Sequence, residues 1–305
     1  MVERRYVWVE DRRGTRLPFS KGILATSLTA TGVTPQDAYR VAEAVEDGLF
    51  DDQRDLVHVD ELVGTIQDQI DRQLGSVEAA AWSSWVEVRR AGHPIIVLLG
   101  GATGVGKSTV ATRLAGRLGI SQVVATDSVR EVMRGIFPAE ILPTLHVSSF
   151  EAHSRALSPV PADHDPVVAG FRQQAEVVAV GIRKLVERAL TEQNDLILEG
   201  VHLIPGMLTD DVEHWTSKGA VSRAVLAVPD STEHQAHFLA RLEHQQRHPQ
   251  RYLDHFGDIR SIHRYLVLQA EANEIPVVDV GALDPTIKSV LQLVIQSVAE
   301  LTDAA

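Results

Sequence analysis

Apolar and polar positions divide the chain into two parts that differ in pattern. From Pro94 onward, short apolar runs typical of buried parallel strands alternate with segments in which apolar residues recur at helical spacing. The five strand-like runs lie at 95–99, 122–126, 195–200, 221–228 and 276–280. This alternation predicts an α/β fold in which a five-stranded parallel sheet is flanked by helices on both faces.

The residues before Pro94 follow a different pattern. Two short strands joined by a turn are expected within residues 6–17, because apolar and polar residues alternate on either side of Asp11-Arg12-Arg13-Gly14. Helical patterns follow at 20–31, 34–49, 58–74 and 77–91. We therefore expect a small α+β domain over residues 1–92 and a larger domain over residues 93–305.

The composition narrows the classes of function. The 305 residues are 44% hydrophobic, which is enough for two cores, and the net charge of −12 argues against nucleic acid as a partner. The chain has no cysteine, so disulfides and thiolate metal sites are excluded. No apolar run is long enough to cross a membrane, and the first residues do not resemble a signal peptide, so a cytoplasmic protein is expected.

A glycine-rich stretch directly follows the first strand of the larger domain. Residues 101–109 read GATGVGKST and fit the phosphate-loop pattern G-x-x-x-x-G-K-[ST] between a strand and a helix. Backbone N–H groups of such a loop bind phosphate oxygens, the lysine reaches the β- and γ-phosphates, and the hydroxyl is placed for Mg²⁺. A glycine turn without a phosphate is the alternative, which the flanking elements disfavour. The residues expected to bind ATP are Gly101, Thr103, Gly104, Val105, Gly106, Lys107, Ser108 and Thr109.

Acidic residues follow the second strand and end the third. The carboxyl ends of parallel strands face the ligand crevice of an open α/β sheet. We expect Asp127 to orient the substrate hydroxyl and accept its proton; its alternative role is the N-cap of a helix over 129–135, and one carboxylate can do both. Glu199 and Ser108 are expected to hold Mg²⁺, directly or through water.

Basic residues near the same crevice are candidates for binding an anionic substrate. Arg130 lies in the first turn after Asp127, and Arg134 lies one turn further, where it is equally consistent with a surface residue. Arg172 lies near the start of a long helix, and His202 follows the third strand. A single histidine in such a position either contacts the substrate or has a structural role.

Two further segments have the character of binding loops or lids. Residues 137–164 are irregular, as binding loops often are. Residues 232–252 are polar and carry several arginines, which predicts a lid that brings guanidinium groups onto the transferring phosphoryl group. Arg241 is the first candidate for this catalytic role, together with Lys107, and an exposed charged surface is the alternative.

Most of the chain resembles the archaeal 2-phosphoglycerate kinase family. The similar stretches are PFSKGILATSLTATGV, PIIVLLGGATGVGKSTVATRLAGRLGI, VVATDSVREVMR, LPTLHVSSF, VVAGFRQQ, LILEGVHLIPG and RHPQRYLDHFGDIRSIHRYL, in this order. The resemblance implies Mg²⁺- and ATP-dependent phosphorylation of 2-phosphoglycerate at its C3 hydroxyl. It also implies a P-loop kinase fold like that of nucleoside monophosphate kinases, with strand order 2-3-1-4-5.

The basic hairpin and the helix after it resemble an ATP-cone, a small regulatory module that binds nucleotide. Arg12, Arg13, Arg16 and Lys21 are its candidate phosphate ligands, and a solvated basic edge is the alternative. Other readings of the whole chain remain open: a kinase for a sugar acid or an inositol phosphate, or an ATP-sensing regulatory protein. A GTPase is disfavoured because the chain has no N/T-K-x-D motif. Whether the chain forms a homo-oligomer is left open.

Overall fold

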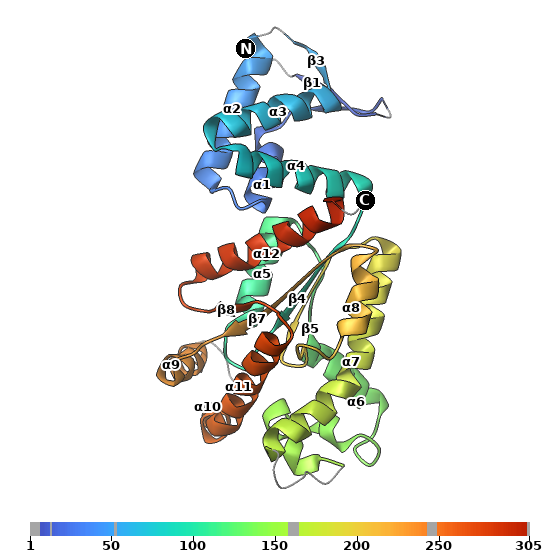
Figure 1. Cartoon of the computed structure of the whole chain (residues 1–305), viewed down its shortest axis with the longest axis vertical. Helices are drawn as coiled ribbons and strands as arrows, with labels where there is room; N and C mark the ends of the chain where they lie inside the picture. The colour runs from blue at the N-terminus through green and yellow to red at the C-terminus, as the bar shows by residue number, and fades with distance from the viewer. Residues whose placement is uncertain (1–6, 13, 52–53, 158–164, 243–248, 304–305) are drawn as a thin grey trace. The chain divides into compact units, whose positions relative to one another are not determined.

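A computed structural model describes residues 7–12, 14–51, 54–157, 165–242 and 249–303, without the side chains of 239–242 and 249 (Figure 1). The chain divides into two compact units. One consists of Met1–Ala91 with Thr302–Ala305, and the other is Gly92–Leu301.

The first unit contains a three-stranded sheet with the order β2-β1-β3. Strands β1 (Trp8–Glu10) and β2 (Arg16–Pro18) pair in antiparallel orientation, which confirms the predicted hairpin. Strand β3 (Leu56–His58) pairs in parallel with β1 and was not predicted. Its three residues precede a helix, and their pairing depends on residues almost fifty positions away in the sequence, so local pattern does not reveal it.

The described part of the first unit also contains the helices α1 (Lys21–Ala30), α2 (Pro35–Asp51), α3 (Val59–Gln73) and α4 (Ser76–Ala91). Ser20 caps α1 by accepting a hydrogen bond from the Ile23 N–H, as expected. The buried stripe of α2 consists of the apolar residues that repeat at helical spacing: Ala38, Val41, Ala42, Val45 and Leu49. This stripe joins the core of the unit, so burial of one helix face stabilises the helix.

The second unit is built on a parallel sheet with the order β5-β6-β4-β7-β8. Its strands are β4 (Ile95–Gly100), β5 (Val123–Ala125), β6 (Leu196–Gly200), β7 (Ala220–Ala227) and β8 (Val277–Asp279). Counted along the chain within this unit, the order is 2-3-1-4-5, as expected. Strand β4 is buried along its whole length, which explains its uninterrupted apolar sequence.

Helices cover both faces of this sheet (Figure 1). Helices α7 (Pro166–Glu192) and α8 (Thr209–Thr216) lie on one face, and α5 (Lys107–Leu118) and α12 (Leu283–Asp303) lie on the other. The core on the α7 side contains Ile96 and Leu98 of β4 and Leu198 of β6, because alternate strand residues share a face. No helix in the described part of the chain is long and apolar enough to cross a membrane.

The remaining elements of this unit are α6 (Thr126–Ile136), η1 (Pro143–His146), η2 (Ser149–Arg155), α9 (Ser231–Leu242), α10 (Pro249–Asp254) and α11 (Phe256–Ala272). Within the irregular stretch 137–164, two 3₁₀ helices are formed, and residues 158–164 lie outside the described residues. Gly170 lets η2 lie directly on α7, because a Cβ atom there would come within 2.3 Å of the His153 backbone.

Candidate active site

The loop between β4 and α5 has the backbone geometry of a phosphate-binding loop. Gly101, Gly104 and Gly106 adopt positive φ angles of 145°, 91° and 88°, a region that favours glycine. At Gly101 there is also no room for a side chain, since a Cβ atom would lie 2.6 Å from the Leu226 carbonyl oxygen. Gly106 is the N-cap of α5, so the loop leads directly into the N-terminus of a helix, where backbone N–H groups favour an anion.

Lys107 and Ser108 begin α5 and point toward different partners. The Lys107 Nζ atom donates a hydrogen bond to the Ala102 carbonyl oxygen at 2.7 Å, so the side chain folds back along the loop. The Ser108 hydroxyl donates to Glu199 Oε1 at 2.7 Å. Parallel pairing places Leu99 of β4 beside Glu199 of β6, which brings this carboxylate to the loop.

These two oxygens are the candidate ligands for Mg²⁺. Glu199 is only 6% exposed, and the Ser108 hydroxyl occupies one of its oxygens. Among the described residues, no group of three or more histidines and carboxylates is arranged to hold a metal by itself. One hydroxyl and one carboxylate fit Mg²⁺, which usually takes few protein oxygens and completes its shell with water and substrate phosphate.

Two residues of α9 lie against the phosphate loop, and neither was predicted. His234 Nε2 donates to the Thr103 carbonyl oxygen at 2.9 Å, while its Nδ1 accepts from Arg260 at 3.3 Å. Burial lowers the pKa of His234 to about 4, so the ring is neutral, as these two hydrogen bonds require. The Phe238 ring occupies the space beside Gly104, where a Cβ atom would lie 2.2 Å from it.

Asp127 lies in the first turn of α6, close to the carboxyl end of β5. The helix begins at Thr126 and its N-cap is Ala125, which makes no side-chain capping bond. The expected helix start at Val129 and the alternative role of Asp127 as an N-cap are therefore wrong. Its carboxylate is 67% exposed and lies 3.4 Å from Arg130 Nε. Pairing of Ala125 with Glu199 places this turn beside the metal candidates.

Arg130 mainly binds the backbone of the segment 143–151, which we call the strap. Its side chain is 11% exposed, and Nη1 donates to the carbonyl oxygens of Leu145 at 2.7 Å and Val147 at 3.1 Å. Its Nη2 donates to Glu131, which also pairs with Arg134. Arg130 therefore holds the strap, a role that differs from the expected binding of a substrate anion. The signal for this role is absent from local sequence, because its partners are main-chain oxygens.

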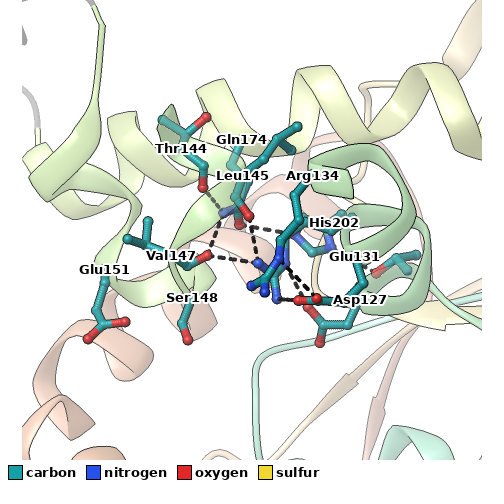
Figure 2. Close-up of polar contacts among 12 residues, drawn as sticks. Asp127, Glu131, Arg134, Thr144, Leu145, Val147, Ser148, Glu151, Gln174 and His202 are labelled. Atoms are coloured by element: carbon teal, nitrogen blue, oxygen red, sulfur yellow. Dashed lines mark hydrogen bonds and ion pairs between the residues drawn. The ribbon is translucent and has the colours of Figure 1, made fainter. Parts of the chain in front are cut away.

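A chain of buried hydrogen bonds connects α6, His202, α7 and the strap (Figure 2). His202 is 1% exposed; its Nε2 donates to Gln174 Oε1 at 3.1 Å, and its Nδ1 accepts from the Thr126 hydroxyl at 2.9 Å. Gln174 Nε2 donates to the carbonyl oxygens of Val147, at 3.0 Å, and of Thr144. Burial lowers the pKa of His202 to about 4, so the ring is neutral, and both of its nitrogens are occupied by Thr126 and Gln174.

The predicted residues Arg172 and Arg241 lie elsewhere or are only partly described, and Arg251 belongs to the predicted lid segment 232–252. Arg172 precedes Gln174 by two residues, which places it about 200° away around α7. The structure therefore does not bring Arg172 together with the residues around Asp127. Arg241 lies in the last turns of α9, and its side chain lies outside the described part of the chain. Arg251 of α10 forms ion pairs with Glu151 and donates to the Ser148 hydroxyl at 3.2 Å, so α10 contacts the strap.

The basic residues of the first unit are largely paired. Arg12 forms an ion pair with Asp60, Arg16 with Glu10 and Lys21 with Glu46. Arg13 lies outside the described residues. These pairs favour a charged, solvated edge at these side chains over a ready site for phosphate.

A 2-3-1-4-5 parallel sheet, a phosphate loop after its first strand and acids after the next two strands are the shared features of one class of enzymes, the P-loop kinases. The fold and site place the chain in this class. A family model described as an AAA domain matches residues 96–261.

Full-length relatives define the family within that class. The 2-phosphoglycerate kinase of Methanothermobacter thermautotrophicus is 37% identical over 92% of both chains. Those of Methanopyrus kandleri and Pyrococcus furiosus are 38% and 36% identical over 92% and 96% of this chain, and over 85% and 95% of their own lengths. The chain belongs to the 2-phosphoglycerate kinase family.

Proposed function

We propose that this chain transfers the γ-phosphoryl group of ATP to the C3 hydroxyl of 2-phosphoglycerate, giving 2,3-bisphosphoglycerate and ADP. The observation that carries the proposal is the hydrogen bond between Ser108 and Glu199, because it joins the phosphate loop to the acid of the third strand. The exposed Asp127 carboxylate beside them supports proton transfer from an acceptor hydroxyl. The relatives named 2-phosphoglycerate kinase support this acceptor over others.

The proposed roles follow the positions of the groups. Backbone N–H groups of residues 101–109 and the Lys107 ammonium bind the ATP phosphates, and Ser108 and Glu199 hold Mg²⁺. When bound, Mg²⁺ neutralises charge on the phosphate oxygens. Asp127 accepts the proton of the acceptor hydroxyl as the new O–P bond forms and the bond from the γ-phosphorus to the bridging oxygen breaks, which leaves ADP.

The acceptor is proposed to lie between Asp127 and the strap. Arg134 supports the binding of its anionic groups, since its side chain is 44% exposed and lies on the same helix as Asp127. Arg130 and His202 hold the strap and α6 in place around this acceptor. Arg241 is proposed to stabilise the charge that spreads over the phosphoryl group during transfer.

We further propose that residues 1–92 and 93–305 are separate domains, with all of these catalytic groups in the second. The ATP-cone resemblance of the first domain remains a hypothesis about regulation, and the paired state of Arg12, Arg16 and Lys21 weighs against phosphate binding by these side chains.

An ADP-release assay with Mg-ATP and a panel of acceptors tests the proposed function. The panel contains 2-phosphoglycerate, 3-phosphoglycerate, glycerate, a sugar acid and an inositol phosphate. Turnover with 2-phosphoglycerate is expected. Turnover with another acceptor alone would mean that the chain is a kinase with a different substrate. No turnover with any acceptor, together with tight ATP binding, would favour an ATP-sensing protein.

A further inference from the structure

A cavity of about 510 Å³ lies outside the phosphate-loop region, between α7, α11 and the turn from β6 to α8. Arg172, Glu176 and Arg183 line it from α7. These residues are about 160° to 200° around the helix from Gln174, so they form the face opposite to the one that binds His202 and the strap. The cavity is therefore separate from the proposed acceptor site.

The two helices that form the cavity are in contact at one end of it. Phe171 of α7 and Tyr265 of α11 pack edge to face, with ring centroids 6.4 Å apart. At the other end, the β6–α8 turn meets α11: Gly206 has a φ of +84°, and a Cβ atom there would lie 2.6 Å from Asn273 Oδ1. Between these two contacts, α11 presents Tyr265, Gln269 and Asn273, one helical turn apart.

The surfaces of α7 and α11 that face the cavity are polar. Helix faces that oppose each other in a domain are usually apolar, because their burial stabilises the fold. Here α7 presents two arginines and one glutamate toward a tyrosine and two amides. Ala179 of α7 is also part of the lining, and the Arg172 and Glu176 side chains are 53% and 58% exposed, so the polar cavity is open to a ligand from solvent.

Several donors in the cavity are available to a ligand. Arg172 makes one long contact, 3.9 Å to Glu176, and its side chain is 53% exposed. Arg183 uses Nε to bind Asp211 at 2.7 Å, and its Nη atoms have no hydrogen bond to another described residue. Burial raises the pKa of Tyr265, so its hydroxyl keeps its proton and is a donor. The lining residues carry two positive charges and one negative charge, which favours an anion.

We propose that this cavity is a second ligand site, which binds a small anion that carries a phosphate or carboxylate group. Arg172 and Arg183 bind the anionic group, because planar guanidinium groups match phosphate and carboxylate oxygens. Tyr265 and Gln269 bind further oxygens of the ligand. The turn that borders the site follows His202 in sequence, and His202 donates to Gln174, which binds the strap.

Titration calorimetry on the full chain tests this site, with saturating Mg-ADP present to fill the phosphate loop. The probes are inorganic phosphate and 3-phosphoglycerate, which distinguish a free phosphate from a phosphorylated acid. We expect one of the probes to bind, and Arg172→Ala to weaken that binding at least tenfold. A hydrogen bond to a charged group has about this effect.

Arg188→Ala is the matched control, because Arg188 is an exposed arginine of the same helix outside the cavity. It should leave binding unchanged, and both variants should keep the Mg-ADP affinity of the native chain. Gln269→Leu provides a second test that does not alter charge and should also weaken binding. The proposal is overturned if neither probe binds, if Arg172→Ala and Arg188→Ala behave alike, or if Arg134→Ala abolishes binding while Arg172→Ala does not. These outcomes do not depend on turnover and so are independent of the proposed function.

Discussion

Asp127 and Glu199 are both acids at strand ends, but their surroundings differ. Glu199 is 6% exposed and accepts a hydrogen bond from Ser108. Asp127 is 67% exposed and caps no helix, so its carboxylate is accessible to a substrate. This difference supports separate roles, with Glu199 at the metal and Asp127 at the acceptor.

Replacement of Asp127 by Asn should lower kcat far more than it changes the affinity for ATP. The amide keeps the size of the carboxylate but cannot accept the hydroxyl proton, and general-base catalysis typically contributes about 100-fold or more. Steady-state kinetics at varied ATP and acceptor concentrations measure both quantities. The control is Asp284→Asn, an exposed acid at the start of α12. An unchanged kcat would contradict the proposed role.

Lys107→Ala should lower kcat about 100-fold or more with little change in the thermal unfolding midpoint, because a positive charge at the phosphates is lost. Lys184→Ala, on the exposed surface of α7, should have no effect on kcat. If both variants keep the native turnover, Lys107 does not act at the phosphates.

Protonation of buried histidines should weaken folding in mild acid. Burial lowers the pKa of His202, His234 and His263 to about 4 from the ordinary value of 6.5. Between these values the unfolded chain binds protons that the folded chain does not, so the free energy of unfolding falls as pH drops below 6.5. Each histidine contributes at most about 1.4 kcal/mol per pH unit. Urea unfolding at pH 7.0 and pH 5.5 measures the effect, and equal stability at both values would contradict it.

At the scale of elements, the strap is fixed by groups from three helices. Arg130 of α6 and Gln174 of α7 bind its carbonyl oxygens, and Arg251 of α10 binds its Ser148 and Glu151 side chains. Each of these three helices therefore makes a direct hydrogen bond or ion pair with the strap. This arrangement explains why the polar residue Gln174 is buried on α7, which otherwise packs through apolar residues.

Gly170→Ala should displace η2 from α7 and lower both stability and activity. The added methyl group would lie 2.3 Å from the His153 backbone, a distance that requires movement. The matched control is Gly116→Ala in α5, where a Cβ atom has no neighbour within 4 Å. Alanine at that open helical position should stabilise the chain by about 0.5–1 kcal/mol. Thermal unfolding and steady-state kinetics measure both variants. Gly170→Ala should lower the unfolding midpoint and raise the acceptor KM, whereas Gly116→Ala should do neither. Equal behaviour of the two variants would refute the packing role of Gly170.

Local patterns predict some of these elements and not others. The phosphate loop was identifiable because its glycines directly follow the apolar run of β4, and Glu199 because it ends the apolar run of β6. Strand β3 and the role of Arg130 depend on partners far along the chain, and the partners of Arg130 are main-chain oxygens. Helical geometry alone separates Arg172 from Gln174, so the position of Arg172 could have been found from spacing.

At the scale of the whole molecule, the observed strand order is the one that the family resemblance implies. The order 2-3-1-4-5 brings the ends of β5, β6 and β4 side by side, so Asp127, Glu199 and the phosphate loop meet although they are far apart in sequence. Relatives that match nearly the full length carry both parts of the chain. The proposed chemistry therefore depends on a topology that the family resemblance predicted and that β-strand pairing confirms.

The most direct measurement is phosphorus NMR of the reaction mixture that contains the full chain, Mg-ATP and 2-phosphoglycerate. 2,3-Bisphosphoglycerate and ADP should appear in equal amounts while ATP is consumed. The Asp127→Asn variant should form this product far more slowly. Consumption of ATP without 2,3-bisphosphoglycerate, or no consumption with 2-phosphoglycerate present, would contradict the proposed reaction.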